Sequence, residues 1–229
     1  MGGSIAAIIL AAGSGSRMQI GVTKQQIEFN GETVLRRSAR IFNECDDIDE
    51  IVIVTRADEM DFAKEAVKGL SKIKSIVVGG KTRAESAKAG FMALEGASYV
   101  AIHDAARCFV TADIISRVVC DAKKYGAATA SSHVTDTVKG IDPEGKIINT
   151  INRDVIRTVQ TPQVFLSELY AKAISTVSLD DPSITDDNAL LERIGVYSYL
   201  TDTGKNNIKL TTLEDLSFAR YLLNGEDYE

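Results

Sequence analysis

Short apolar runs alternate with amphipathic stretches through the first half of the chain, and this rhythm limits the possible folds more than any other feature. The predicted strands are short, apolar and mostly β-branched: 5–10, 51–55, 76–78 and 99–103. The predicted helices carry apolar residues at intervals of three and four: 34–43, 59–70, 83–94, and a stretch from the N-cap Thr111 to about Tyr125. This alternation predicts an α/β fold, a mostly parallel twisted sheet with helices on both faces.

The second half departs from this rhythm. Residues 127–133 are small and apolar, and an alternating stretch at 134–151 contains the turn sequence DPEG at 142–145. This pattern indicates a β-hairpin with no helix after it. Such a hairpin cannot bury both of its faces alone, so we expect an arm at about 134–152 that packs on a second subunit.

The end of the chain returns to regular elements at 166–175, 186–194, 196–200, 207–210 and 213–223. No internal repeat or linker divides the sequence, so residues 1–229 are expected to form one domain.

Charge and hydropathy exclude several classes of protein. Lys and Arg number 26 against 32 Asp and Glu, a net charge of −6, so a diffuse basic surface for nucleic acid is not expected. The longest apolar run, 5–12, is far shorter than the ~20 residues of a membrane helix, and no basic segment precedes it as in a signal peptide. A cytoplasmic protein without a nucleic-acid or membrane partner is expected.

The few cysteines and histidines argue against a disulfide framework and a zinc site. Cys45, Cys108 and Cys120 are odd in number and form no CxxC motif, which is typical of free thiols in a reducing compartment. His103 and His133 are the only histidines and belong to no metal-binding cluster.

The glycine-rich loop after the first predicted strand is a candidate phosphate-binding site. Gly13 and Gly15 allow backbone N–H groups to approach a ligand, while Arg17 and Lys24 add positive charge. The loop lacks the GxxxxGK[ST] pattern, and Met18 stands where a dinucleotide fingerprint needs glycine. A tight turn without a ligand is the alternative.

Two further loops follow predicted strands. GGKTRAES at 79–86 could read a base through backbone groups and the Ser86 hydroxyl, or could be only a turn. In HDAAR at 103–107, Asp104 is suited to Mg²⁺, which takes one or two carboxylates plus substrate phosphates. The alternative is an ion pair between Asp104 and Arg107, and His103 is expected to be a hydrogen-bonded structural residue.

Eight segments in register carry a resemblance to a known family: AAGSGSRM (11–18), TKQQ (23–26), GGKTRAES (79–86), HDAAR (103–107), DTVK (136–139), NRDVIRTVQTPQVF (152–165), TDDNALLE (185–192) and NIKLTTLEDL (207–216). Together they resemble the 2-C-methyl-D-erythritol 4-phosphate cytidylyltransferases of the non-mevalonate isoprenoid pathway. The resemblance implies a Rossmann-like nucleotidyltransferase fold with a protruding β-hairpin arm, and a homodimer with shared active sites.

The resemblance also implies a reaction. The phosphate of methylerythritol phosphate would attack the α-phosphorus of CTP in line and release pyrophosphate, with Mg²⁺ as the divalent cation. Phosphoryl-type transfer relies on positioning and charge neutralisation, which agrees with the lack of a Ser/His or Cys/His constellation.

Residue roles carry over as implications of the resemblance. Arg17 and Lys24 would stabilise the transition state, Arg153 and Lys209 would also act in catalysis, and Asp104 would hold the metal. The implied nucleotide-binding residues are Ala11, Ala12, Gly13, Ser14, Gly15, Gly80, Arg83, Ser86 and Ala105. The implied substrate-binding residues are Arg107, Thr137, Arg153, Thr161, Thr185 and Lys209. In the family, the segments matching Thr137 and Arg153 reach the neighbouring subunit's site.

Four positions depart from the family pattern. Thr23 and Cys108 stand where proline is usual, Lys81 replaces an acidic residue, and Asn206 replaces aspartate. Lys81 cannot accept a hydrogen bond from the cytosine amino group. Two other functions remain open at this point: a ribitol-5-phosphate cytidylyltransferase, and a catalytically silent nucleotide-binding module.

Overall fold

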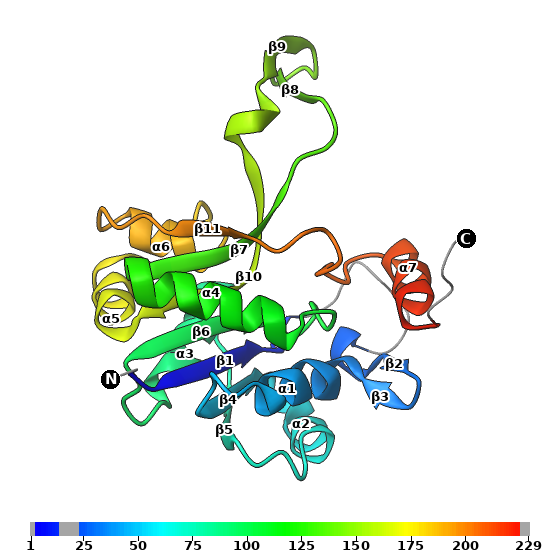
Figure 1. The fold of residues 1–229 in the computed structure, drawn as a ribbon, viewed down its shortest axis with the longest axis vertical. Coiled ribbons are helices and arrows are strands. Elements are labelled where there is room, and N and C mark those ends of the chain that lie inside the picture. The colour runs from blue at the N-terminus through cyan, green and yellow to red at the C-terminus, as the bar shows by residue number, and fades with distance from the viewer. Residues whose placement is uncertain (1–2, 14–22, 225–229) are drawn as a thin grey trace.

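The computed structural model describes residues 3–13 and 23–224, and its centre is a seven-stranded sheet (Figure 1). The strand order across the sheet is β11 (Tyr199–Asp202), β7 (Ala127–His133), β10 (Arg157–Leu166), β6 (Tyr99–Asp104), β1 (Ile5–Leu10), β4 (Glu50–Thr55) and β5 (Ile73–Val78). All neighbouring pairs are parallel except the two that β10 forms with β6 and β7. The predicted mostly parallel sheet is therefore confirmed.

Because β10 runs opposite to its neighbours, its first residues lie at the edge of the sheet where the parallel strands end. Parallel strands bring their carboxyl ends to one edge, where ligands bind in α/β folds. Leu10 and Asp104 lie opposite each other at that edge, at the ends of β1 and β6. Because β10 is antiparallel, it brings its first half there, and the Asp104 backbone N–H donates a 3.1 Å hydrogen bond to Thr161 Oγ1.

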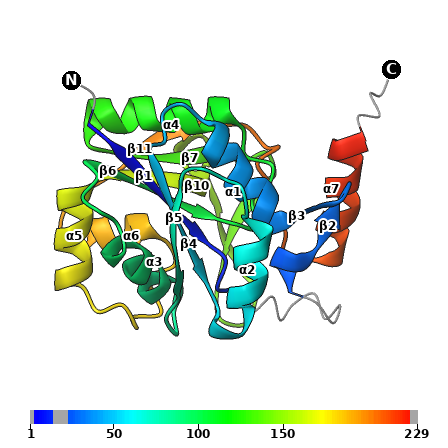
Figure 2. The same cartoon turned by 90° about the horizontal axis from the view of Figure 1, so that it is seen from below.

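Helices cover both faces of the sheet (Figure 2). One face packs against α1 (Val34–Glu44), α2 (Met60–Ala66) and α4 (Ala112–Tyr125). The other packs against α3 (Arg83–Met92), α5 (Ser167–Thr176) and α6 (Asp187–Glu192). In β1, Ile5 and Ile9 belong to the first core, while Ile8 and Leu10 belong to the second. Successive side chains of a strand point to opposite faces of the sheet, so β1 is buried on both faces.

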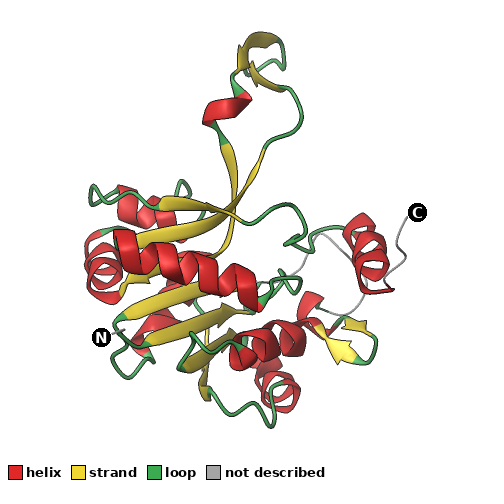
Figure 3. Ribbon diagram, viewed as in Figure 1, coloured by secondary structure: helices red, strands yellow, loops and turns green. Residues whose placement is uncertain are grey.

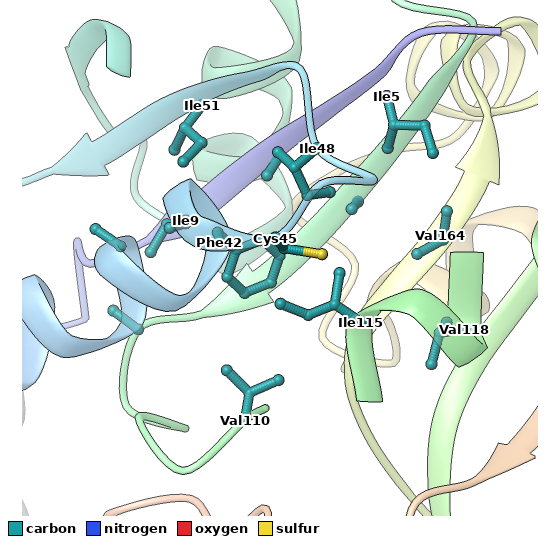
Figure 4. Packing of buried hydrophobic residues seen from close by; sticks show 14 of the residues in the cluster. Ile5, Ile9, Phe42, Cys45, Ile48, Ile51, Val110, Ile115, Val118 and Val164 are labelled. Carbon is teal, nitrogen blue, oxygen red and sulfur yellow. The ribbon is translucent and has the colours of Figure 1, made fainter. Parts of the chain in front are cut away.

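The first core is built around Phe42 of α1, shown with its neighbours in Figure 4. Phe42 and Ile115 of α4 are fully buried, and the ring of Phe42 lies 4.8 Å from that of His103 between the centroids. Burying each such side chain stabilises the fold by about 1.5–3 kcal/mol. Helix α4 begins as predicted, because the Thr111 side chain accepts a hydrogen bond from the Ile114 N–H.

A hairpin of β8 (Val138–Ile141) and β9 (Ile147–Ile151) projects from the sheet as an arm, with the short 3₁₀ helix η3 (Arg153–Val155) near its base (Figure 3). Its turn follows the predicted DPEG sequence: the Gly145 N–H donates to the Asp142 carbonyl oxygen, and Gly145 takes a positive φ of 87° that suits glycine.

A smaller apolar cluster lies beside the end of the sheet. It joins a two-stranded ribbon, β2 (Glu28–Phe29) and β3 (Glu32–Thr33), to the C-terminal helix α7 (Leu213–Asn224). The 3₁₀ helix η1 (Lys24–Gln26) leads into this ribbon, and another, η2 (Ala57–Glu59), precedes α2. None of the helices within the described residues is long and apolar enough to cross a membrane.

Several sequence-based boundaries were wrong. The helix expected at 59–70 ends at Ala66 because Gly69 takes a φ of +86°, and the strand expected at 196–200 is β11, shifted to Tyr199–Asp202. Residues 207–210 form neither helix nor strand. Strand β10 was not predicted, since Pro162 and two glutamines interrupt its apolar pattern, and Pro162 lies where the register with β7 shifts between Val159 and Gln163.

Candidate active site

Two adjoining pockets open at the carboxyl edge of the sheet. The larger, of about 420 Å³, is lined by residues at the ends of β1 and β6, in the 79–86 segment, in η1 and in the segment before α7: Leu10, Ala12, Gly13, Lys24, Gln25, Gly80, Lys81, Thr82, Arg83, Ser86, Asp104, Ala106 and Lys209. The smaller, of about 220 Å³, is lined by Arg83, Asp104, Arg107, Val159, Gln160, Thr161, Gln163, Thr185, Asp186 and Lys209. The two share Arg83, Asp104 and Lys209, so these three side chains lie where the pockets meet.

Asp104 is the anionic centre of this junction. Lys209 Nζ lies 2.6 Å from its Oδ2, and Arg83 Nε lies 3.0 Å from its Oδ1. Burial raises the pKa of this carboxyl, but the two cations outweigh burial and hold the pKa well below its usual range. Asp104 is therefore ionised at neutral pH.

Arg107 is not the ion-pair partner of Asp104, so the alternative of a loop closed by that pair is wrong. Its guanidinium instead donates to two backbone carbonyl oxygens, those of Asn207 at 2.8 Å and Val159 at 3.5 Å. These bonds hold Arg107 at the edge of the smaller pocket.

Arg83, at the start of α3, connects Asp104 to a second buried carboxylate. Its NH1 lies 2.5 Å from Oδ2 of Asp187, which is fully buried and also accepts a 2.8 Å bond from the Tyr170 hydroxyl. Burial raises the pKa of Asp187, and the Arg83 guanidinium opposes that rise. A half-buried guanidinium held by two carboxylates has few conformations open to it, so Arg83 is fixed in place where the two pockets meet.

The 79–86 loop is shaped by the N-terminus of α3. Thr82 and Glu85 form a capping box, and the Gly80 N–H donates to Ser86 Oγ at 3.1 Å. A Cβ atom at Gly79 would lie 2.8 Å from the Ala12 Cβ, so only glycine allows the loop to approach the end of β1 this closely. This contact brings two loops that line the larger pocket together.

The described part of the first loop runs along the larger pocket. Ala12 and Gly13 line it, and the Ala11 N–H is bonded to the Val54 carbonyl oxygen. Ser14, Gly15 and Arg17 lie outside the described residues. Ala105 is fully buried, and its neighbour Ala106 lines the pocket.

His103 is a structural residue, as predicted. It is fully buried, its Nδ1 lies 3.0 Å from Thr161 Oγ1, and its Nε2 lies 3.3 Å from the Arg107 carbonyl oxygen. A carbonyl oxygen can only accept, so Nε2 carries the hydrogen and Nδ1 accepts from the Thr161 hydroxyl. Desolvation lowers the pKa of His103 to about 3, which keeps the ring neutral.

The remaining predicted residues divide into two places. Thr161, Thr185, Arg107 and Lys209 meet at the smaller pocket. Thr137 and Arg153 are exposed on the arm and line neither pocket of their own chain, and the Arg153 guanidinium donates to the Thr135 carbonyl oxygen.

A family model described as 2-C-methyl-D-erythritol 4-phosphate cytidylyltransferase matches residues 5–225. The chain belongs to this family. A Clostridium perfringens protein of that name is 37% identical over 223 residues, which cover 96% of this chain and 99% of the relative. A Symbiobacterium thermophilum cytidylyltransferase is 39% identical and covers 97% and 94%. The resemblance seen in the eight sequence segments is confirmed.

Solved structures of the family share the fold. The 4-diphosphocytidyl-2C-methyl-D-erythritol synthase of Anaerococcus prevotii superposes with a TM-score of 0.85 at 31% identity, covering 96% of this chain and 98% of that one. The Thermus thermophilus cytidylyltransferase gives 0.79 at 27% identity, covering 96% and 99%. The predicted nucleotidyltransferase fold is confirmed, and the chain is a cytidylyltransferase that uses CTP, as the enzymes of this family do.

Sequence reasoning assigned no role to several buried polar residues that support the site. They are Gln160, Gln163, Asp187 and Asn207. Each lies inside one of the eight matching segments, but nothing in the local sequence distinguishes a polar residue that lines a pocket from one that holds a loop behind it.

Proposed function

We propose that the chain joins CTP to 2-C-methyl-D-erythritol 4-phosphate, giving 4-diphosphocytidyl-2-C-methyl-D-erythritol and pyrophosphate. A phosphate oxygen of the substrate forms a bond to the α-phosphorus of CTP while the bond between that phosphorus and the bridging oxygen to the β-phosphate breaks. The observation that carries the proposal is the pair of adjoining pockets that share Arg83, Asp104 and Lys209. Two bound substrates would meet at this junction.

The larger pocket takes CTP in this proposal. Its backbone groups at Ala12 and Gly13 would hold the triphosphate together with Ser14 and Gly15, while Gly80, Arg83 and Ser86 surround the nucleoside. Ala11 and Ala105, which the resemblance also implies, are fully buried with their N–H groups bonded to the Val54 and Leu10 carbonyl oxygens, so they support this pocket from behind. Lys24 and Arg17 would stabilise the charge that develops on the phosphates in the transition state. Preorganised cations lower the barrier because they need not reorient as the charge forms.

The smaller pocket takes methylerythritol phosphate. Arg107 and Lys209 supply positive charge for its phosphate, and the hydroxyl of Thr185 is suited to its polyol. The Thr161 hydroxyl lines the same pocket but donates its hydrogen to His103, so toward a polyol it can only accept. The substrate phosphate is already an anion near neutral pH, so the attack needs no general base. Alignment of the attacking oxygen is then the main task of these residues.

Mg²⁺ fits the donor set at the junction. Asp104 offers one ionised carboxylate to both pockets, and Mg²⁺ completes its sphere with substrate phosphates and water. Within the described residues no group of three or more His, Cys, Asp or Glu side chains could hold a metal without a substrate. When bound, the ion would neutralise charge on the triphosphate, while Asp104 holds it beside Arg83 and Lys209.

The arm supports a homodimer with shared sites. Its exposed apolar side chains are Ile141, Ile147, Ile148 and Val155, of which Val155 is 78% exposed. Apolar surface of this kind on a projecting hairpin is suited to burial against a second copy of the chain. In such a dimer Thr137 and Arg153 would reach the partner's smaller pocket. Residues 1–229 would form one domain, with the arm at about 134–152. The enzyme would be cytoplasmic.

The proposal is tested with the purified protein, CTP and Mg²⁺, measuring pyrophosphate release with each of two alditol phosphates. We expect turnover of methylerythritol phosphate and little with ribitol 5-phosphate. Turnover of ribitol 5-phosphate alone would overturn the proposed substrate, and CTP binding without turnover of either would indicate a silent nucleotide-binding module.

A further inference from the structure

The segment that carries Lys209 has no regular secondary structure, yet it places that side chain 2.6 Å from Asp104. At its two ends the backbone is bonded to the body of the protein: the Thr203 N–H donates to the Ser131 carbonyl oxygen and the Leu210 N–H to that of Ala106. Between these ends, side chains hold the segment, and Asn207 is the most buried of them, with no exposed surface.

The Asn207 amide makes two hydrogen bonds to strand β10. Its Nδ2 donates to the Thr161 carbonyl oxygen at 2.8 Å and to Gln160 Oε1 at 3.0 Å. Because the Thr161 carbonyl can only accept, the amide nitrogen must face β10. The backbone carbonyl of Asn207 in turn accepts the 2.8 Å bond from Arg107. Asn207 is therefore bonded to three residues that line the smaller pocket, Gln160, Thr161 and Arg107.

Gln160 completes this arrangement, and its orientation is determined by the same reasoning. Its Nε2 donates to the Gly204 carbonyl oxygen at 3.1 Å, which turns Oε1 toward Asn207 and the Thr203 hydroxyl, 3.1 Å away. Each side-chain amide therefore has one orientation that satisfies these partners, and in that orientation the buried Asn207 Oδ1 has no hydrogen-bond partner among the described residues. A buried polar network of this kind specifies a single arrangement of the chain.

We propose that Asn207 is a positioning residue, which acts through Arg107 and Lys209 to set the geometry of the methylerythritol phosphate pocket. This inference rests on the proposed function. Asn207 is fully buried and lines neither pocket, so it would not touch a substrate. Lys209 follows it by two residues and Arg107 is bonded to its carbonyl, so a shift of Asn207 moves both cations together.

The variant Asn207→Asp tests this role with almost no change in volume. It replaces the Nδ2 donor by an oxygen that faces two acceptors, the Thr161 carbonyl oxygen and Gln160 Oε1. Repulsion there would displace the segment between Gly204 and Lys209. We expect kcat/KM for methylerythritol phosphate, at saturating CTP, to fall about 100-fold, because an error of about 1 Å in positioning costs this much.

The second measurement is the affinity for CTP alone, by calorimetry without the second substrate. A misfolded variant would lose this affinity as well, whereas a positioning defect would not remove it. Lys209 also lines the larger pocket, but the other described residues there are not bonded to Asn207, and Leu210 is anchored separately to Ala106. We therefore expect CTP affinity to stay within about threefold of wild type, a difference of about 0.7 kcal/mol. The matched control is Thr201→Val, which removes the part-buried 2.6 Å hydrogen bond from a buried threonine to Asp121, a residue outside this segment. It should keep its kcat/KM.

Equal losses of CTP affinity and of kcat/KM in Asn207→Asp, or an unchanged kcat/KM, would overturn the inference. If Asn207→Asp does not fold, Asn207→Ala removes the same two hydrogen bonds without placing a repelling oxygen there, and the same selective loss is expected or the inference fails. Absence of turnover by the wild-type chain would overturn the proposed function instead, so the two failures are distinguishable.

Discussion

Lys24 and Leu210 are 186 positions apart in the chain, yet the Lys24 ammonium group donates a 2.9 Å hydrogen bond to the Leu210 carbonyl oxygen. Lys209, the neighbour of Leu210, is bonded to Asp104. The short segment at 209–210 thus connects two of the proposed catalytic lysines, Lys24 from near the start of the chain and Lys209 from near its end. The site can form only when the C-terminal part has packed on the sheet.

Replacing Lys24 should therefore impair the reaction more than the fold. Lys24→Ala removes a preorganised cation from the larger pocket, and we expect kcat to fall on the order of 10²–10³-fold. Steady-state pyrophosphate release measures the loss, and circular dichroism checks that the fold is intact. The control Lys68→Ala removes a lysine whose side chain is 73% exposed, and it should behave as wild type. Normal activity of Lys24→Ala would reject the assigned role.

Mixing two inactive variants tests whether sites are shared between subunits. Arg153→Ala and Lys24→Ala should each be inactive alone, because each destroys one contribution to every site. In a random mixture half of the dimers are mixed, and each has one intact site, so activity should return to about a quarter of wild type. A mixture of Arg153→Ala with the wild-type protein, incubated until subunits have exchanged, serves as the reference. No recovery despite exchange would count against shared sites.

The free energy of unfolding should depend on pH through His103. Its pKa is lowered by burial from about 6.5 to about 3, so the unfolded chain binds a proton below pH 6.5 that the folded chain does not. This contribution to stability is complete above pH 6.5 and falls as the pH drops toward 3, by at most about 1.4 kcal/mol per pH unit.

Urea unfolding at several pH values between 7.5 and 5 measures this dependence. His103→Gln should flatten the curve below pH 6.5, whatever its effect on stability at pH 7.5. An unaltered slope in His103→Gln would contradict the prediction.

The unusual Thr23 should tolerate the proline that is common in the family. Thr23 has a φ of −78°, which proline adopts without strain, but its N–H donates a 3.2 Å bond to Gln26 Oε1. Thr23→Pro loses that bond, a cost of about 0.5–1.5 kcal/mol. It also restricts the unfolded chain, a gain of about 0.4–1 kcal/mol. We expect a net change in unfolding free energy below about 1 kcal/mol with activity retained, and a loss of several kcal/mol would show that the two effects do not offset each other.

Much of the fold could be predicted from local pattern. Strands β1, β4 and β6 are short apolar runs buried on both faces, and their boundaries agree with the sequence to within a residue. The start of α4 could be read from Thr111, because capping is a contact between near neighbours in the chain. Strand β10 could not be predicted, because Gln160 and Gln163 are buried by partners that lie far away in the sequence.

The sequence by itself determined which residue types gather at the carboxyl edge of the sheet, since strands and their following loops are local features with a recognisable period. Only the tertiary structure decided how the charges are paired. The Asp104 carboxylate is bonded to Arg83 and Lys209, 21 and 105 positions away, rather than to the guanidinium of nearby Arg107. The physical reason is that β10 runs antiparallel and the segment around Asn207 packs against it, which holds Arg107 on backbone carbonyls and leaves the carboxylate to cations from other parts of the chain.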